Sequence, residues 1–467
     1  MLFNSIEFLG AFLPITLLGY FLLNKYKLDT AGKIWLLFCS LFFYAWWKPI
    51  YLILIVSLML FNFFAGQKLN YVENPRRRKI FYITCLMVNL SVLLYYKYAN
   101  FMVANINLIL PKGHELIMEK VALPLAISFF TFQKFAYITD SYKGETKGYN
   151  FLDFSLFVAF FPQLIAGPIV HHKKIVPQFE AISNKRFQLS NFLRGTYLFL
   201  MGLVKKIAIA DTFAILANSG YGNAGHLSFI DSWFVSISYA VQLYFDFSGY
   251  SDMAIGAALM FNIKLPINFN SPYKSTNIQD FWRRWHITLG SFLREYIYIP
   301  LGGNRAGEFQ TCINLFITFL VGGIWHGANW TFVIWGMLHG IALVVHRMWQ
   351  KTKWKMNDAF GIVITFLFVN FAWVFFRATT FKDAISVLKS MVGLNSFHYS
   401  GSNVTTDIYL APTLLVGIIL LFCKNPNQLV SEFATNRKHL FYMVVLTIIG
   451  LIYLNSITAS DFLYFDF

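Results

Sequence analysis

Charged residues are scarce in this sequence. Asp, Glu, Lys and Arg make up 13% of its 467 residues, whereas a soluble globular domain carries about 25%. The shortage extends along the whole chain, which argues against a soluble protein with one anchor. Apolar runs such as Phe8–Leu23, Tyr51–Ala65 and Phe360–Phe376 have about the length that crosses a hydrocarbon core of about 30 Å. The composition predicts an all-α, polytopic integral membrane protein with roughly 10–12 transmembrane helices.

Acidic residues are the scarcer charge. There are 22 of them against 38 Lys and Arg, which gives a net charge of +16. The basic residues stand in short stretches between apolar runs, the densest being Arg76–Lys79, and cytosolic loops carry such an excess. The charge therefore predicts cytosolic loops, an N-terminus outside the cytosol and contacts with membrane lipids, with no nucleic-acid partner. Some of it would also attract an anionic cytosolic substrate.

The sequence lacks a close pair of cysteines, and its four cysteines are Cys39, Cys85, Cys312 and Cys423. Their positions in or at the ends of apolar segments predict buried free thiols, with no disulfide and no metal. His326 and His339 would lie roughly 20 Å apart on one continuous helix, which is too far to chelate one ion. No metal site is predicted, although a site assembled from distant segments stays open.

The middle of the chain does not have uninterrupted apolar runs. Pro124, Pro162 and Pro168 interrupt helical hydrogen bonding, and Lys205-Lys206 falls inside another run. Irregular backbone at membrane depth survives only where protein covers it or where it lines a cavity. We therefore expect broken or re-entrant helices around a central cavity. The polar stretch 263–308 is expected at the cytosolic face.

The segment 322–330 contains one histidine among glycines and tryptophans, and it lies between two apolar runs. A neutral imidazole can take a proton from a hydroxyl and return it to a leaving group, as acyl transfer to an alcohol requires. His326 is the candidate base, with Trp325 and Asn329 beside it. The alternative is a histidine that only packs helices together.

Two further segments could contribute to a site. In 281–286, Arg283 and Arg284 suit phosphate groups because a guanidinium matches their geometry, and Trp285 and His286 follow directly; the alternative is a basic segment on lipid headgroups. In 244–252, Asp246 could orient a histidine or pair with an arginine, and a structural role is favoured. Ser248 and Asp252 of that segment lie four residues apart, on one helical face.

The sequence resembles the membrane-bound O-acyltransferases, in particular the branch that contains the membrane subunit of bacterial alginate O-acetylation. The resemblance extends over nearly the whole chain and depends on segments 123–133, 167–169, 245–254, 280–286, 298–305 and 325–327 in this order. One departure is Gly290, where a bulkier residue is expected.

The resemblance implies the fold, a single domain over 1–467 and a site in the bacterial inner membrane. His326 matches the principal catalytic histidine of the family and His286 the second one. The family also implies a cytosolic acyl donor, most simply acetyl-CoA as a substrate with no further cofactor. An exported or periplasmic partner protein would complete O-acetylation of the polysaccharide.

The sequence thus predicts an enzyme that transfers an acetyl group from cytosolic acetyl-CoA across the membrane. The acceptor would be an exported cell-envelope polysaccharide such as alginate or peptidoglycan, with His326 as base or transient acyl carrier. Arg283, Arg284, Trp285, Asp246, Ser248, Asn329 and Trp325 would bind substrate or donor. Two alternatives stay open: D-alanyl transfer to teichoic acid by the same fold, and a transporter or flippase of an acylated intermediate.

Overall fold

A computed structural model describes residues 1–395, 415, 417–419, 421–456, 462 and 463. Over these ranges the chain is helical and contains no strand, which confirms the all-α prediction. The α-helices are α1 (Leu13–Lys25), α2 (Asp29–Ala45), α3 (Ile50–Tyr71), α4 (Pro75–Leu93), α5 (Ala99–Asn107), α6 (Ile127–Tyr142), α7 (Phe151–Ala159), α8 (Phe161–Leu164), α9 (His172–Glu180), α10 (Leu189–Val204), α11 (Asp211–Gly222), α12 (Phe229–Met260), α13 (Ile278–Arg284), α14 (Ile287–Leu293), α15 (Glu308–His326), α16 (Trp330–Trp349), α17 (Asp358–Arg377), α18 (Phe381–Met391), α20 (Pro426–Ser431) and α21 (Arg437–Ser456).

Within the described part of the chain, seven helices have the length and apolar composition to cross a membrane. They cover Phe8–Lys25, Ile50–Tyr71, Pro75–Asn107, Glu308–His326, Trp330–Trp349, Asp358–Arg377 and Arg437–Leu454. The chain is therefore a multi-pass membrane protein. The expected total of roughly 10 to 12 spans stays a prediction.

The contacts of the chain fall into two units. The first comprises residues 1–199 and 253–266, and the second comprises 200–252 and 267–467. The prediction that residues 1–467 form one domain stays a prediction, as does the central cavity.

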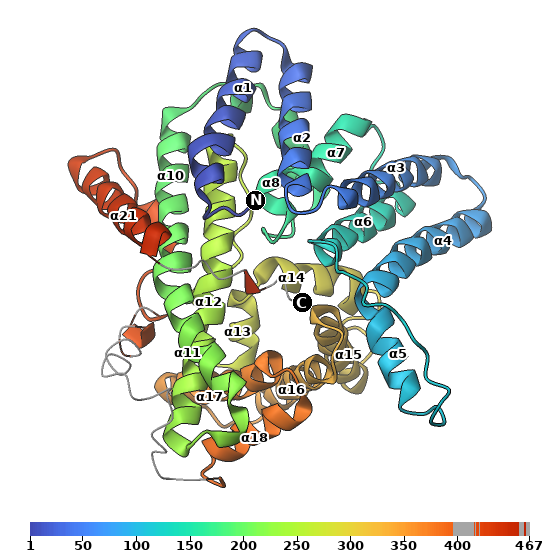
Figure 1. The fold of residues 1–467 in the computed structure, drawn as a ribbon. Coiled ribbons are helices and arrows are strands. Elements are labelled where there is room, and N and C mark those ends of the chain that lie inside the picture. Colours follow the sequence, from blue (N-terminus) through green and yellow to red (C-terminus); the bar gives the residue numbers. More distant parts are fainter. Residues whose placement is uncertain (396–414, 416, 420, 457–461, 464–467) are drawn as a thin grey trace. The chain divides into compact units, whose positions relative to one another are not determined.

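In the first unit, α1 and α2 form an antiparallel hairpin, and α3, α4 and α6 lie side by side (Figure 1). Two buried amides join α3 to α4, because the Asn62 and Asn89 side chains exchange hydrogen bonds of 2.9 and 2.8 Å. A close approach holds α3 against α6 at Gly66, where a Cβ would lie 2.4 Å from the Tyr137 ring. These contacts fix the position of α6.

Three basic residues of the first unit bind partners on neighbouring segments. Lys33 binds Asp153 at 2.6 Å, Lys185 binds Asp29 at 2.6 Å, and Arg78 at the start of α4 donates to the Ser141 carbonyl at the end of α6. Arg78 belongs to the basic stretch Arg76–Lys79, whose cytosolic position stays a prediction.

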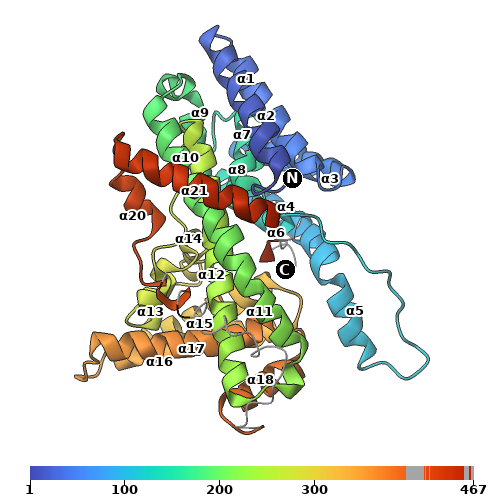
Figure 2. The same cartoon turned by 60° about the vertical axis from the view of Figure 1, so that its left-hand side comes forward.

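In the second unit, α15 and α16 form a closely packed hairpin, and α17 packs along α16 (Figure 2). Gly323 and Gly336 permit the approach, since a Cβ on Gly323 would lie 2.5 Å from the Phe332 carbonyl oxygen and 2.8 Å from the Gly336 Cα. At the open end of the hairpin, Glu308 of α15 binds Arg347 of α16 and also Lys351.

The predicted interruptions are present. α7 ends at Ala159, ahead of Pro162 in α8. A π-helical turn at Lys205–Ala210 separates α10 from α11, and residues 267–307 contain only short helices. The four thiols are free, as expected, but the expected burial of all four is wrong for Cys423, which is exposed.

Candidate functional site

The site is built around the turn between α15 and α16. α15 ends at His326 because Gly327 takes an extended conformation, and Asn329 caps α16 by accepting a hydrogen bond from the Thr331 N–H at 3.2 Å. The continuous helix assumed for the His326–His339 spacing is therefore wrong. His326 is only 3% exposed, and the turn fixes it at the closed end of the hairpin.

Aromatic rings surround His326. Its ring centroid lies 4.9 Å from Trp325, 5.0 Å from Trp335 and 5.1 Å from Phe376. These faces exclude water from the imidazole, which is the environment in which polar interactions with a reacting group are strongest.

The rings beside His326 belong to a larger group, which we call the aromatic layer: Trp282, Trp285, Trp335, Trp373 and Phe376. Trp335 stacks on Trp373 at 5.7 Å, and Trp373 contacts Trp285 at 5.0 Å. Trp282 meets the edge of Trp335 at 5.7 Å. The layer thus connects the surroundings of His326 with the segment that contains Trp285 and His286.

His339 is buried inside the same layer. Its ring lies 4.7 Å from Trp335 and 5.0 Å from Trp282. The Trp282 indole N–H donates to His339 Nδ1 at 3.2 Å, so His339 carries its proton on Nε2 when neutral. Sequence reasoning considered His339 only as a metal ligand, whereas the structure makes it part of the support for Trp282.

His286 is buried at the start of α14. Its Nδ1 lies 3.1 Å from Asn268 Oδ1, which also accepts hydrogen bonds from the Thr288 N–H and hydroxyl. The backbone donor fixes the orientation of the Asn268 amide, so His286 Nδ1 must be the donor and Nε2 carries the lone pair. Burial lowers the pKa of His286 to about 3, and the imidazole is therefore neutral near pH 7. It contacts the Phe247 ring of α12 at 4.7 Å.

A pocket of about 410 Å³ opens between α13, α14, α15 and α16. We call it the basic pocket, because Arg283, Arg294, His346 and Arg347 line it together with apolar side chains and Trp282. Arg283 and Arg294 are exposed. Trp282 belongs both to this lining and to the aromatic layer, and it therefore joins the basic pocket to the surroundings of His326.

Asp246 does not contact a histidine among its described partners. Its carboxylate lies 2.8 Å from Lys206 Nζ and accepts a hydrogen bond from the Leu463 N–H at 3.0 Å. Lys206 also binds Asp211 at 2.7 Å, and the neighbouring Lys205 binds Asp252 at 2.7 Å. Buried charges need such partners. These ion pairs agree with the structural role that the sequence favoured, with lysine in place of the suggested arginine.

The other predicted site residues lie outside the aromatic layer and the basic pocket. Arg284 lies outside the basic pocket and forms an ion pair with Asp280 at 3.0 Å. Asn329 donates to the Thr379 carbonyl at 2.8 Å in addition to capping α16. Ser248 is buried, and its hydroxyl has no hydrogen-bond partner among the described residues. The structure thus places Trp325 against His326 and connects Trp285 to His326 through Trp373 and Trp335, whereas Arg283 lies in the basic pocket beside Trp282.

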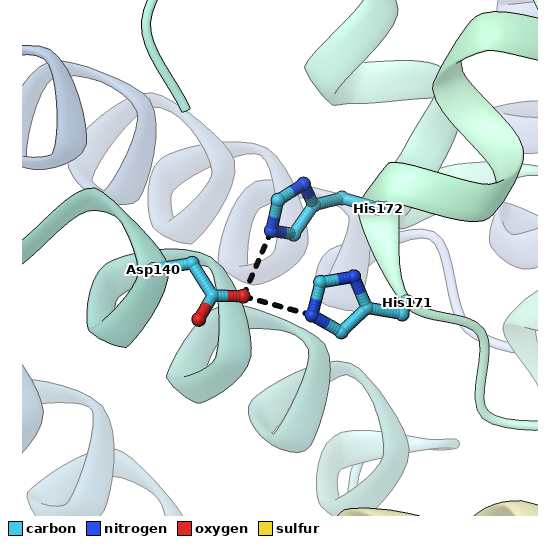
Figure 3. Close-up of side chains that lie close together, drawn as sticks. All are labelled: Asp140, His171 and His172. Carbon is cyan, nitrogen blue, oxygen red and sulfur yellow. Dashed lines mark hydrogen bonds and ion pairs between the residues drawn. The ribbon is translucent and has the colours of Figure 1, made fainter. Parts of the chain in front are cut away.

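One cluster was missed by sequence reasoning. Asp140 at the end of α6 lies 2.9 Å from Nε2 of both His171 and His172 (Figure 3). Burial by itself raises the pKa of the Asp140 carboxyl, but the hydrogen bonds from the two imidazoles outweigh it and hold this pKa below its usual range. The available signal was a His-His pair before a basic stretch, but its partner lies more than thirty residues away.

Comparisons with known proteins give consistent matches. Residues 78–381 match the family described as MBOAT, membrane-bound O-acyltransferase family. A peptidoglycan O-acetyltransferase of Helicobacter pylori is 45% identical over 100% of this chain and 98% of its own length. A probable alginate O-acetylase of Pseudomonas aeruginosa is 40% identical over 90% of this chain and 81% of its own. A teichoic acid D-alanyltransferase of Streptococcus thermophilus is 29% identical over 54% and 68%, respectively.

Proposed function

The chain belongs to the membrane-bound O-acyltransferase family, and from this premise we propose that it transfers acetyl groups from acetyl-CoA for O-acetylation of an exported cell-envelope polysaccharide. The observation that carries the proposal is the placement of His326. It lies buried at the closed end of the α15–α16 hairpin, and the aromatic layer joins it to the basic pocket. The names of the relatives in Helicobacter and Pseudomonas favour peptidoglycan or alginate as the acceptor class.

The basic pocket would hold the donor. Arg283 and Arg294 present exposed guanidinium groups to phosphates, and the apolar wall includes Phe319 of α15. Phe319 precedes His326 by seven residues, which is about 10 Å along the helix. The flexible pantetheine arm of coenzyme A can cover this distance, while the nucleotide stays in the pocket.

His326 would perform the acyl transfer. As a general base, its neutral imidazole takes the proton of the acceptor hydroxyl while the hydroxyl oxygen attacks the thioester carbonyl, and the proton then passes to the departing thiolate. As a nucleophile, the imidazole first takes the acyl group, the thiol leaves, and the hydroxyl attacks the acyl-imidazole. His286, with its lone pair fixed on Nε2, would assist by positioning or by accepting a proton.

The excess of Lys and Arg in the loops favours a donor side in the cytosol of a bacterial cell, and we propose that the protein lies in the inner membrane with its N-terminus outside the cytosol. Glu308, Arg347 and Lys351 lie at the basic-pocket end of the hairpin, so His326 lies toward the outer side. An exported partner protein would then carry the acetyl group to the polysaccharide.

The test uses purified protein in proteoliposomes with labelled acetyl-CoA. We expect His326→Ala to lower thioester turnover by at least about 10²-fold, the usual contribution of a general base. The matched control is His114→Ala, which removes an exposed histidine of the first unit and should leave turnover unchanged. Equal turnover in His326→Ala would refute the proposed mechanism.

Two readouts separate the alternatives. Binding of acetyl-CoA is measured without turnover, so that a missing partner protein does not hide the donor site, and Arg283→Ala should weaken it. The mass of the transferred group distinguishes acetyl from D-alanyl. Net flux of an acylated compound with an intact donor would support a transporter in place of the enzyme.

A further inference from the structure

The cluster formed by Asp140, His171 and His172 has the composition of a metal centre. We propose that these three side chains bind a divalent transition-metal ion such as Zn²⁺. Asp140 Oδ2 lies 2.9 Å from Nε2 of each imidazole, and the three ligand atoms all lie within 4.8 Å of one another. Two histidines and one carboxylate, with a fourth position left for water, are a ligand set that zinc accepts.

The arrangement in Figure 3 has the required convergence. His171 and His172 project from the start of α9, and both point their Nε2 atoms at the same oxygen of Asp140 on α6. In a tetrahedral zinc site with bonds of about 2.0–2.1 Å, neighbouring ligand atoms lie about 3.3 Å apart. The two separations of 2.9 Å therefore need to widen by a few tenths of an ångström, and the two Nε2 atoms, which lie within 4.8 Å of each other, need to come to the same spacing.

The three side chains of the cluster are buried to different extents. The Asp140 side chain is 1% exposed and that of His172 is 0% exposed, whereas His171 is 19% exposed. An ion can thus reach the cluster from the His171 side, where a water molecule can complete its coordination. Lys143 approaches the other oxygen of Asp140 at 3.5 Å, so Oδ2 is the oxygen available to a metal.

The residues around the imidazoles can set their protonation for metal binding. The Tyr149 hydroxyl lies 3.0 Å from His172 Nδ1. It can donate there while His172 Nε2–H faces Asp140, or accept from Nδ1–H while Nε2 binds a metal, and such partners commonly orient metal-bound histidines.

His171 must change its tautomer to bind a metal. Its Nδ1 now accepts a hydrogen bond from the Lys173 N–H at 3.2 Å, so its proton is on Nε2 and points at Asp140. Metal binding through Nε2 moves this proton to Nδ1 and sacrifices one partly exposed helix-capping bond. The gain is three metal–ligand bonds that join α6 to α9 and, through Tyr149, to the loop between α6 and α7.

The experiment is a metal titration of the full-length protein in detergent, purified on a tag without histidine and stripped with a chelator. Co²⁺ is the probe, because bound cobalt reports tetrahedral coordination by its visible absorption, and Zn²⁺ should displace it. We expect one equivalent of Co²⁺ per chain and a thermal midpoint that rises with added metal. Tyr149→Phe should weaken binding by about 10-fold.

Asp140→Asn and His172→Gln keep hydrogen-bonding groups in the cluster and should lose most of the affinity. His171→Ala, at the most exposed of the three positions, provides a variant that tolerates substitution if the buried ones do not fold. His114→Ala is the matched control and should bind like the wild type. The proposal fails if the wild-type protein takes up no Co²⁺, or if the folded Asp140, His171 and His172 variants bind it as the wild type does.

Discussion

Because α15 and α16 approach closely at Gly323, we expect the single methyl group added by Gly323→Ala to disturb their packing. In Gly323→Ala, the new Cβ would lie 2.5 Å from the Phe332 carbonyl oxygen and 2.8 Å from the Gly336 Cα. Both atoms belong to the backbone, so no side-chain rotation relieves the contact. Since non-bonded carbon contacts are optimal near 3.5 Å, the two helices must separate by about 1 Å.

The neighbouring glycine supplies the matched control. In Gly322→Ala, the nearest atom is Leu293 Cδ1 at 3.3 Å, the end of a flexible side chain. Each substitution gains about 0.5–1 kcal/mol from replacing a helical glycine. Overpacking at Gly323 costs about 1–3 kcal/mol. Gly322→Ala should therefore be neutral or slightly stabilised, and Gly323→Ala destabilised by up to about 2.5 kcal/mol.

The effect on activity should exceed the effect on stability. Gly323 lies one turn before His326 on α15, and Gly336 lies next to Trp335 on α16, so the separation displaces both His326 and Trp335. A misplacement of about 1 Å can lower the rate about 10²-fold. Thermal midpoints in detergent and acetyl-CoA turnover of the two variants measure both effects. If Gly323→Ala proves as stable and as active as Gly322→Ala, the two helices do not approach as the structure describes, and the argument from their packing is wrong.

Three further predictions concern other parts of the second unit. Gly290→Phe should fill the basic pocket and raise the KM for the donor, whereas Gly290→Ala should not, because a Cβ there has its nearest neighbour, the Trp282 carbonyl oxygen, at 3.7 Å. Lys206→Met leaves buried carboxylates without their cation, which costs about 3–5 kcal/mol and should lower the thermal midpoint far more than Lys206→Arg. Burial lowers the pKa of His286 to about 3, whereas the pKa of a histidine in the unfolded chain is about 6.5. The stability that neutral His286 contributes is therefore complete above about pH 6.5 and is lost as the pH falls toward 3. The loss amounts to at most about 1.4 kcal/mol per pH unit. The thermal midpoint of His286→Gln should therefore fall less steeply across that window.

The helices were predictable where local chemistry decides them. The apolar run Tyr51–Ala65 forms the N-terminal part of α3, and Phe360–Phe376 forms most of α17. The interruption at Lys205-Lys206 was also visible, because two charges inside an apolar run disturb a membrane helix. The form of this interruption could not be predicted. It is a π-helical turn whose lysines bind Asp211, Asp246 and Asp252, and the most distant of these partners follows by more than forty residues.

The candidate site was predictable only where its residues form a distinctive local segment. His326 stands in a distinctive local segment, and Arg283 lies in a basic run beside aromatic residues. The aromatic layer combines α13, α16 and α17, and no local periodicity indicates that Trp282, Trp335 and Trp373 will meet. The Asp140 cluster shows this limit most clearly. Neither the carboxylate at the end of α6 nor the His-His pair before α9 is unusual alone, and only the packing of the first unit brings them together.

On the proposed function, the α15–α16 hairpin would connect a donor on one side of the membrane with an acceptor on the other. α15 has 19 residues, which is about 29 Å of helix and close to the thickness of a hydrocarbon core. The basic pocket lies toward its Glu308 end, and His326 lies at the other. A donor held in the pocket, as proposed, would present its thioester toward His326, while its charged nucleotide would stay toward the Glu308 end. On the proposed function, the thioester arm covers the distance of about 10 Å between Phe319 and His326 while the nucleotide stays in the pocket, so no separate transport step for an activated acetyl group would be needed before the acceptor attacks.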